Sequence, residues 1–120
     1  MSDNTEPAAI LERLYATIAD RRTADPGSSY TAKLLHEGRA RIAQKMGEEA
    51  VETAIAAVAR DAEAVISESA DLIYHLLVLW ADCGVQPAEV WKKLQAREGT
   101  SGLAEKASRP PVAPEDWRGD

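Results

Sequence analysis

Apolar residues recur at spacings of three and four along most of this chain, which is the period of an α-helix with one buried face. The first such stretch covers residues 7–22 and predicts a helix that Pro7 opens in its first turn. The segment ADPGSSY at residues 24–30 contains Pro, Gly and Ser, so it predicts a loop. A short helical stretch follows over residues 31–37 and is bounded by Gly38.

Two longer helical patterns occupy the middle of the chain, at about residues 39–60 and 62–83. Asp61 is the expected N-cap of the second, and Gly84 is the residue expected to end it. The run LIYHLLVLW in this second helix is apolar nearly all round, as is typical of the central helix of a bundle. A further helix is predicted over residues 87–98, with a proline in its first turn.

The C-terminal part, from residue 99 onward, combines Gly, Ser and three Pro. This composition predicts a tail that is ordered only if another part of the molecule holds it. We expect one domain over residues 1–109, followed by a disordered or extended tail over residues 110–120. The chain has 22 Ala and no Phe, and Ala favours helices over strands. The predicted fold class is therefore all-α, a four-helix-type bundle without a β-sheet.

Length and charge narrow the possible partners. The chain has 120 residues and a formal charge of −6, which disfavours a partner made of nucleic acid. No apolar run approaches the roughly 20 residues of a membrane span, and the N-terminus lacks a signal pattern, so we expect a cytoplasmic protein that does not bind membranes. A bundle this small, with an almost wholly apolar central helix, has more apolar surface than a monomer covers, which predicts a homodimer.

Acidic residues form a stripe on each of the two long predicted helices. Glu48, Glu49 and Glu52 lie within about a third of the first helix circumference. Glu68 and Asp71 lie three residues apart on the second, on a face with apolar neighbours that is expected to point into the bundle. Carboxylates in such a place are costly unless they are neutralised, and Mg²⁺ prefers oxygen ligands. A solvated, ion-paired surface is the alternative interpretation.

Cations and hydrogen-bond donors that could receive phosphate lie near these stripes in the sequence. Arg41 and Lys45 precede Glu52 on the same helix face, and ion pairing along the helix is their alternative role. The loop end offers hydroxyls and helix N-terminal amides, which could bind an anion or simply cap the helix. His75 shares the acidic face of its helix, and a hydrogen-bonded core position is the alternative there. The candidate phosphate-binding residues of this region are Ser29, Tyr30, Thr31, Lys33, Arg41 and Lys45.

The acidic pattern resembles that of a known superfamily. Glu49-Ala-Val-Glu52, fifteen residues and then Glu68-Ser-Ala-Asp71 are similar to the ExxE…ExxD pattern of the MazG-like all-α NTP pyrophosphatases. The segments SYTAKLLHEGRARIAQKMGEEAVE, ESADLIYHLLVLW and GTSGLAEKASR resemble, more narrowly, the phosphoribosyl-ATP pyrophosphohydrolases of histidine biosynthesis. The similarity covers about residues 10–109 and is expected to indicate the stand-alone form of the enzyme.

This resemblance implies a dimeric, Mg²⁺-dependent enzyme that hydrolyses phosphoribosyl-ATP to phosphoribosyl-AMP and pyrophosphate, the second step of histidine biosynthesis. It implies Glu49, Glu52, Glu68 and Asp71 as metal ligands and catalytic residues. Glu48 is a further catalytic candidate, as a ligand, an orienting residue or a general base. The resemblance also turns the C-terminal segment into a candidate phosphate clamp through Lys106 and Arg109.

Two other functions are compatible with the residues. A house-cleaning nucleoside triphosphate pyrophosphatase would need the same four carboxylates, and a non-catalytic helical interaction module would need only a solvated acidic face. Pyrophosphate release from phosphoribosyl-ATP compared with ATP separates the first alternative. Stabilisation by Mg²⁺ separates the second, because a module without a metal site gains nothing from the ion.

Overall fold

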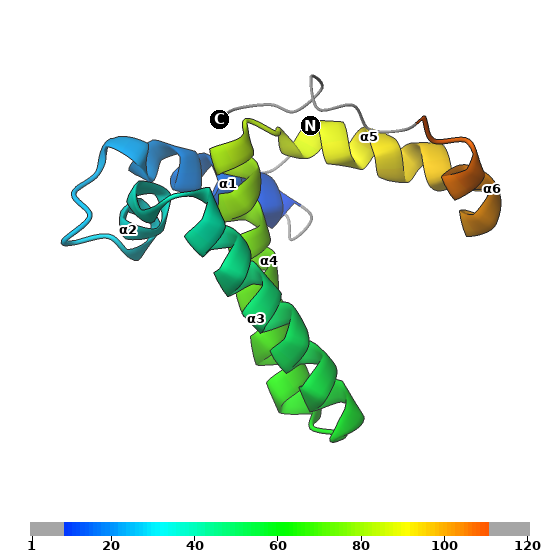
Figure 1. Ribbon diagram of the computed structural model, residues 1–120, viewed down its shortest axis with the longest axis horizontal. Helices are drawn as coiled ribbons and strands as arrows, with labels where there is room; N and C mark the ends of the chain where they lie inside the picture. The colour runs from blue at the N-terminus through cyan, green and yellow to red at the C-terminus, as the bar shows by residue number, and fades with distance from the viewer. Residues whose placement is uncertain (1–8, 111–120) are drawn as a thin grey trace.

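The computed structural model describes residues 9–110, and every regular element in this range is helical (Figure 1). The predicted all-α class is therefore confirmed. Helix boundaries differ from the predicted ones by at most three residues for the first five α-helices. The elements are α1 (Ile10–Asp20), the 3₁₀ helix η2 (Arg21–Thr23), α2 (Tyr30–Glu37), α3 (Arg39–Val58), α4 (Ala62–Cys83), α5 (Pro87–Arg97) and α6 (Gly102–Ala107).

The ends of α4 follow from local chemistry. A side-chain oxygen of Asp61 accepts a hydrogen bond from the backbone N–H of Ala64 at 3.1 Å, which satisfies one of the free amides of the first turn. Gly84 ends the helix in the left-handed conformation, with φ of 74° and ψ of 23°. No atom outside its immediate neighbours lies within 4 Å of where a Cβ would stand. The constraint at Gly84 is therefore its backbone conformation and not crowding.

The break between α2 and α3 is also local. Ser29 caps α2, because its hydroxyl oxygen accepts a hydrogen bond from the N–H of Ala32 at 3.1 Å. Gly38 has φ of 102°, which a residue with a side chain rarely adopts, so α2 ends there and α3 begins in a new direction. This break turns α2 across the end of the α3–α4 pair.

The core lies at one end of the long α3–α4 hairpin, where α1 and α2 pack against it (Figure 1). The rest of the hairpin extends away from this core as two antiparallel helices that contact each other. The expected inward orientation of the acidic face is therefore not met within one chain, because no third helix covers it in the described region. The buried core residues are Tyr15, Ile18, Leu34, Ile42, Leu77, Val78 and Ala81.

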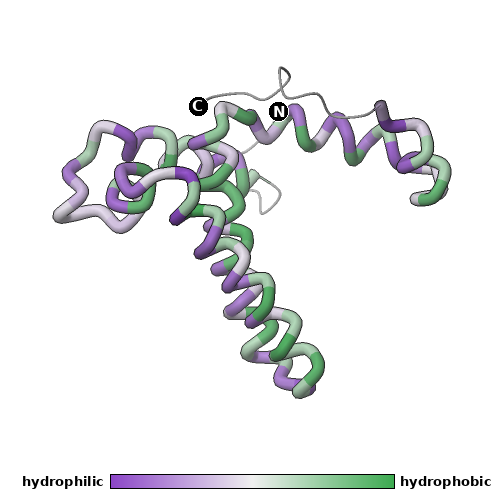
Figure 2. The backbone as a smooth tube through the Cα atoms, viewed as in Figure 1, coloured by the Kyte–Doolittle hydropathy of each residue, from purple (hydrophilic) through white to green (hydrophobic). Residues whose placement is uncertain are grey.

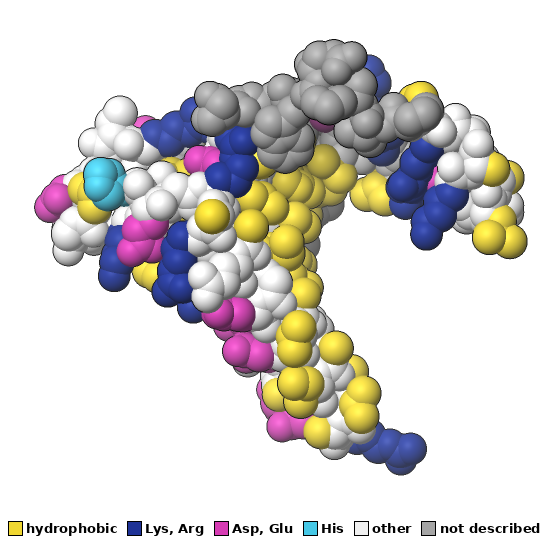
Figure 3. Space-filling view, viewed as in Figure 1, with side chains coloured by type: hydrophobic (Ala, Val, Ile, Leu, Met, Phe, Trp, Pro, Cys, Tyr) yellow, Lys and Arg dark blue, Asp and Glu magenta, His cyan; other side chains and the backbone are white. Residues whose placement is uncertain are grey.

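Hydrophobic residues, green in Figure 2, recur along the extended part of the hairpin up to its tip. Val58 is 85% exposed, and its neighbours on the same faces are also largely open to solvent. Figure 3 shows these apolar side chains along one edge of the hairpin and acidic side chains along the other. We call the apolar edge the hairpin stripe; it consists of Val51, Ile55, Val58, Ile66 and Ile73.

One helix within residues 9–110, α4, is long and apolar enough to cross a membrane when only its length and composition are considered. Its most apolar window has a mean hydropathy of 1.3 although acidic residues interrupt it, which is why the sequence pattern predicted no such helix. Core helices of proteins that do not span membranes meet the same two criteria. Since α4 packs along α3 and against α1, we describe it as the central helix of this fold.

The segment after residue 98 was expected to be ordered only if another part of the molecule holds it, and the structure shows a helix there, α6. Ser101 caps this helix by accepting a hydrogen bond from the N–H of Ala104 at 3.1 Å. Glu105 bonds to Arg109 at 2.6 Å and to Arg97 of α5 at 3.6 Å, so the two helices are tied together. We call α5 and α6 the C-terminal arm. Of the predicted tail over residues 110–120, all but residue 110 lies outside the described residues.

Candidate functional site

Carboxylates from α3 and α4 converge on the acidic edge of the hairpin. One ligand oxygen from each of Glu49, Glu68 and Asp71 lies within 4.8 Å of the others. Glu52 lies beside this group: it lines the same pocket as Glu68 and is the main cause of the raised pKa of that residue. The four residues meet because α3 and α4 run antiparallel in contact, and because each pair is spaced by three residues along its helix. The structure thus brings three of the four predicted ligands into one group, with Glu52 next to Glu68.

The electrostatics of this group are unfavourable without a cation. Hydrogen bonds with Glu52 and Glu49, together with desolvation and the negative charges of both residues, raise the pKa of Glu68 from 4.5 to about 7. One oxygen of Glu49 and one of Glu68 are buried and have no hydrogen-bond partner. A buried acceptor without a partner is costly, so a cation in contact with these two oxygens would be stabilising.

A divalent cation fits this donor set. The available donors are carboxylate oxygens from two helices, and Mg²⁺ binds oxygen ligands, commonly through a few carboxylates together with substrate phosphate. The partner-free oxygens of Glu49 and Glu68 are the atoms that such an ion would satisfy. Glu49, Glu52, Glu68 and Asp71 are the residues that could hold it.

Glu48 lies outside this group. It is exposed, accepts a hydrogen bond from Nε2 of Gln44 at 3.0 Å and pairs with Nζ of Lys45 at 3.4 Å. The hydrogen bond from Gln44 is the main cause of a pKa below the usual value for this carboxyl. Its side chain is therefore turned along α3 toward the N-terminal cations and away from the carboxylate group.

The two α3 cations that the sequence suggested for phosphate binding, Arg41 and Lys45, are each engaged in an ion pair. Lys45 pairs with Glu48, as the alternative interpretation of the sequence expected. Arg41 pairs instead with Glu37 of α2 at 3.7 Å. Both cations nevertheless lie on the same helix as Glu49 and Glu52, at the end of the carboxylate group that faces the core.

The start of α2 is held against α4 next to the carboxylates. The ring nitrogen Nδ1 of His75 lies 2.8 Å from the carbonyl oxygen of Asp71, and Nε2 lies 3.4 Å from the hydroxyl of Tyr30. Tyr30 stacks on Tyr74, whose own hydroxyl is hydrogen-bonded to Thr31. His75 is 5% exposed, which confirms its interpretation as a hydrogen-bonded core residue.

Tyr74 is the residue in this region that the sequence did not suggest. Burial raises the pKa of its phenol, which keeps it protonated and able to hydrogen-bond to Thr31. The sequence did contain a signal, because Tyr74 and His75 are adjacent polar residues and so are Tyr30 and Thr31. In the structure Tyr30 contacts His75, and Thr31 contacts Tyr74. Three of the predicted phosphate-binding residues, including the cap Ser29, are thus close to one another at the end of α2.

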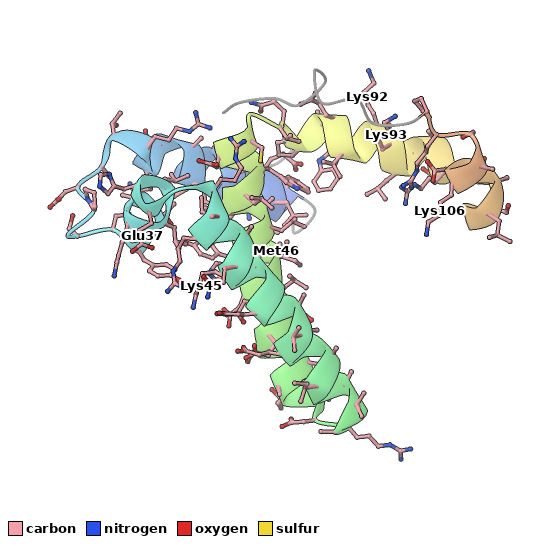
Figure 4. The ribbon with its side chains drawn as sticks, in the orientation of Figure 1. Glu37, Lys45, Met46, Lys92, Lys93 and Lys106 are labelled. Carbon is pink, nitrogen blue, oxygen red and sulfur yellow. The ribbon has the colours of Figure 1, made fainter. Side chains whose placement is uncertain are left out.

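The remaining predicted cations do not join the carboxylates in this chain. Lys33 is exposed on α2. Lys106 and Arg109 belong to α6 and its end, at the far end of the C-terminal arm (Figure 4). Figure 4 draws Lys45 beside α3 and Lys106 at the opposite side of the molecule.

A cavity of about 620 Å³ lies elsewhere, between η2 and the following loop, α2 and the end of α4. The guanidinium of Arg22, on its wall, donates a hydrogen bond to the carbonyl oxygen of Ala81. The cavity contains none of the four carboxylates, and we assign the functional site to the carboxylates because the partner-free buried oxygens lie there. Its lining residues are Arg22, Thr23, Ala24, Pro26, Ala32, Leu35, His36 and Asp82.

Fold and site together define a helical protein with a cation-receptive acidic site between two antiparallel helices. The profile of the family described as phosphoribosyl-ATP pyrophosphohydrolase matches residues 11–98. The chain belongs to this family and is a hydrolase.

Three relatives carry the name phosphoribosyl-ATP pyrophosphatase. The protein of Azospirillum brasilense is 63% identical over 109 residues, which are 91% of this chain and 98% of the relative. That of Paramagnetospirillum magneticum is 59% identical over 104 residues, or 87% of this chain and 95% of the relative. That of Granulibacter bethesdensis is 54% identical over 112 residues, or 93% of this chain and 70% of the relative. The similarity therefore covers the carboxylate group and both helices that carry it.

Proposed function

We propose that this chain hydrolyses phosphoribosyl-ATP to phosphoribosyl-AMP and pyrophosphate, the second step of histidine biosynthesis, with Mg²⁺ as cofactor. The names of the relatives support the substrate. The observation that carries the proposal is the carboxylate group of Glu49, Glu68 and Asp71, with oxygens within 4.8 Å, and the buried oxygens without partners.

In this proposal Glu49, Glu52, Glu68 and Asp71 bind Mg²⁺. The ion would neutralise charge on the transferred phosphate and on the leaving pyrophosphate. Water attacks the phosphoanhydride that joins the α- and β-phosphates, and a P–O bond of the bridging oxygen breaks so that pyrophosphate leaves. A carboxylate of the site accepts the proton that the water loses. Glu48 has a positioning role, because its ion pair fixes Lys45 beside the site.

The phosphates are received by the end of α2 and by the neighbouring cations. The hydroxyl of Tyr30 is oriented by His75, and the N-terminal end of α2, where Ser29 caps the amide of Ala32, favours anions. Arg41 and Lys45 can exchange their carboxylate partners for phosphate, because both pairs are only partly buried. Outside the C-terminal arm, the residues proposed to contact the substrate are Ser29, Tyr30, Thr31, Lys33, Arg41 and Lys45.

The deciding experiment compares kcat/KM for phosphoribosyl-ATP and ATP at saturating Mg²⁺, with pyrophosphate release as the readout. The triphosphates are alike, so preference must come from the added ribose phosphate with its extra negative charge. Two charge-assisted contacts of about 1.5–3 kcal/mol each favour phosphoribosyl-ATP by about a hundredfold or more. Equal values would reject this substrate and favour a house-cleaning nucleoside triphosphate pyrophosphatase. Because the chain belongs to an enzyme family, we do not propose a non-catalytic helical interaction module.

We further propose that the protein is a cytoplasmic homodimer in which the hairpin stripe packs against a second copy. The support is the exposure of Val51, Ile55 and Val58, at 59%, 62% and 85%, on one face of α3. A second hairpin on this face would complete the four-helix bundle that the sequence predicts and that two helices alone cannot form. The domain would extend through residue 109 and include the C-terminal arm.

A further inference from the structure

The C-terminal arm is a basic segment on an acidic chain. Five of the chain's 14 Lys and Arg lie between residues 92 and 109, although the whole chain has a formal charge of −6. Trp91 fixes the base of the arm, since it stacks edge-to-face on Trp80 at 5.8 Å and donates a hydrogen bond to Glu12 of α1. Beyond this anchor the arm is exposed to solvent.

The arm extends away from the carboxylates of its own chain (Figure 1). Asp71 lies twelve residues before Cys83, where α4 ends, so the helix carries the chain about 18 Å from the site before the arm begins. The eleven residues of α5 then lead about 16 Å to the side. Lys106 follows at the end of this path, too far for its side chain to return to the same chain's site.

The far part of the arm has features of a surface that another chain covers. Leu94 is 51% exposed and Leu103 is 86% exposed, so α5 and α6 each present an unpaired apolar side chain. Arg97 of α5 pairs with Glu105 of α6, which holds α6 against α5, and Arg109 pairs with the same carboxylate at i,i+4. Lys106, among the described residues, forms no ion pair. The arm thus offers positive charge on a fixed support.

We infer that the arm acts on a second copy of this chain: Lys106 and Arg109 of one copy receive the phosphates of the substrate held at the carboxylate group of the other. Charge complementarity selects this occupant, because the hairpin presents an acidic edge and the arm presents cations on the opposite side of its own chain. The inference rests on the proposed function, and it makes each active site a product of two chains.

The test uses assemblies of two differently tagged, co-expressed chains purified on both tags. In the first assembly one chain carries Glu52→Gln and Asp71→Asn, and the other carries Lys106→Ala and Arg109→Ala. If the arm acts on the partner, one of the two sites combines intact carboxylates with an intact arm, and the assembly has about half of the wild-type activity. If the arm acts on its own chain, both sites are defective, and activity falls about a hundredfold.

The reciprocal assembly reverses the expectation. Here one chain carries all four substitutions and its partner is wild type. An arm that acts on the partner leaves both sites defective, whereas an arm that acts on its own chain leaves the wild-type chain with about half of the activity. An active reciprocal assembly together with an inactive first assembly would overturn the inference.

A second measurement separates the inference from the proposed function. Calorimetric titration with pyrophosphate and Mg²⁺ does not depend on turnover. The first assembly should bind one pyrophosphate per pair of chains and the reciprocal assembly should bind none tightly. Wild-type protein that releases no pyrophosphate from phosphoribosyl-ATP refutes the proposed function, while the titration still decides the arm's partner.

The matched control changes two other cations of the arm, Lys92→Ala and Lys93→Ala, with the same change in charge. This variant should retain activity within about twofold, because the inference assigns the phosphates to Lys106 and Arg109 alone. An equal loss in both variants would mean that the arm contributes only net charge. Full activity of the Lys106→Ala and Arg109→Ala homodimer, or a stable active monomer, would also overturn the inference.

Discussion

The hydroxyl of Tyr30 lies 3.4 Å from Nε2 of His75, whose other ring nitrogen bonds to the backbone of Asp71. Nδ1 donates to that carbonyl oxygen, so in the neutral ring Nε2 is the acceptor for the tyrosine hydroxyl. An exposed tyrosine at the start of α2 is thereby fixed relative to a carboxylate of the site. The imidazole of His75 thus orients the Tyr30 hydroxyl while the imidazole itself is buried in the core.

Replacement of Tyr30 by Phe removes this hydroxyl and leaves the ring stacked on Tyr74. We expect KM for phosphoribosyl-ATP to rise about two- to tenfold, the value of one hydrogen bond, with little change in the thermal midpoint. Tyr15→Phe is the matched control, because it removes a hydroxyl that donates to the carbonyl oxygen of Val85 at 2.9 Å. That control should lower the midpoint and leave KM unchanged. The reverse pattern would contradict the role of Tyr30.

Replacement of Glu52 or Asp71 by its amide should abolish activity and also remove stabilisation by Mg²⁺. For the unmodified protein, Mg²⁺ at a hundred times its dissociation constant should stabilise the fold by about 2.7 kcal/mol, measured by chemical denaturation. Glu63→Gln, in the first turn of α4, is the control, because its side chain is exposed and outside the group. Near-normal activity of the Glu52 amide would exclude this residue from the site.

The raised pKa of Glu68 predicts a pH-dependent stability of the metal-free protein. Its pKa is about 7 in the folded chain and 4.5 in the reference state, so the folded chain retains a proton that the unfolded chain loses. Stability therefore decreases as pH rises between about 4.5 and about 7. Glu68→Gln should lack this decrease. Chemical denaturation of the unmodified protein and of Glu68→Gln, in a chelator at about pH 5 and about pH 7.5, tests this prediction. An equal loss of stability in the two proteins would contradict Glu68 as its cause.

Disruption of the hairpin stripe should separate the dimer. Ile55→Glu combined with Val58→Glu introduces charge where both side chains are already exposed in one chain, so a monomer would tolerate the change. In an interface the same charges are buried, and we expect association to weaken at least about tenfold by light scattering. Ile10→Glu, exposed at 53% on α1, is the control and should remain dimeric. A dimeric double variant would exclude this face.

The sequence predicted those features that local chemistry determines. The limits of α4 were correct because Asp61 and Gly84 act on the backbone next to them. The convergence of Glu49 and Glu68 was predictable because two helices joined by a tight turn must run antiparallel. Even the missed α6 had a local signal in Ser101, whose capping role was obscured by the surrounding Gly and Pro.

Features that depend on distant contacts were not predictable in this way. The pair of Tyr30 and His75 joins residues 45 apart in the sequence, and neither periodicity nor capping specifies it. The direction of the C-terminal arm depends on Trp91 meeting Trp80 and Glu12, which only the packed structure brings together. The separation of Lys106 from the carboxylates of its own chain follows from that direction.

The left-handed backbone conformation of Gly84 determines which mirror form of an amino acid could replace it. A side chain of ordinary L configuration would be strained at φ of 74°, although the space around the position is empty. The mirror-image amino acid meets no such strain, because the left-handed helical region is its preferred one. A chemically assembled chain with D-alanine at position 84 would keep the end of α4 unchanged. It would also restrict the unfolded chain, adding about 0.4–1 kcal/mol of stability by the same entropic effect as a compatible Gly-to-Ala exchange.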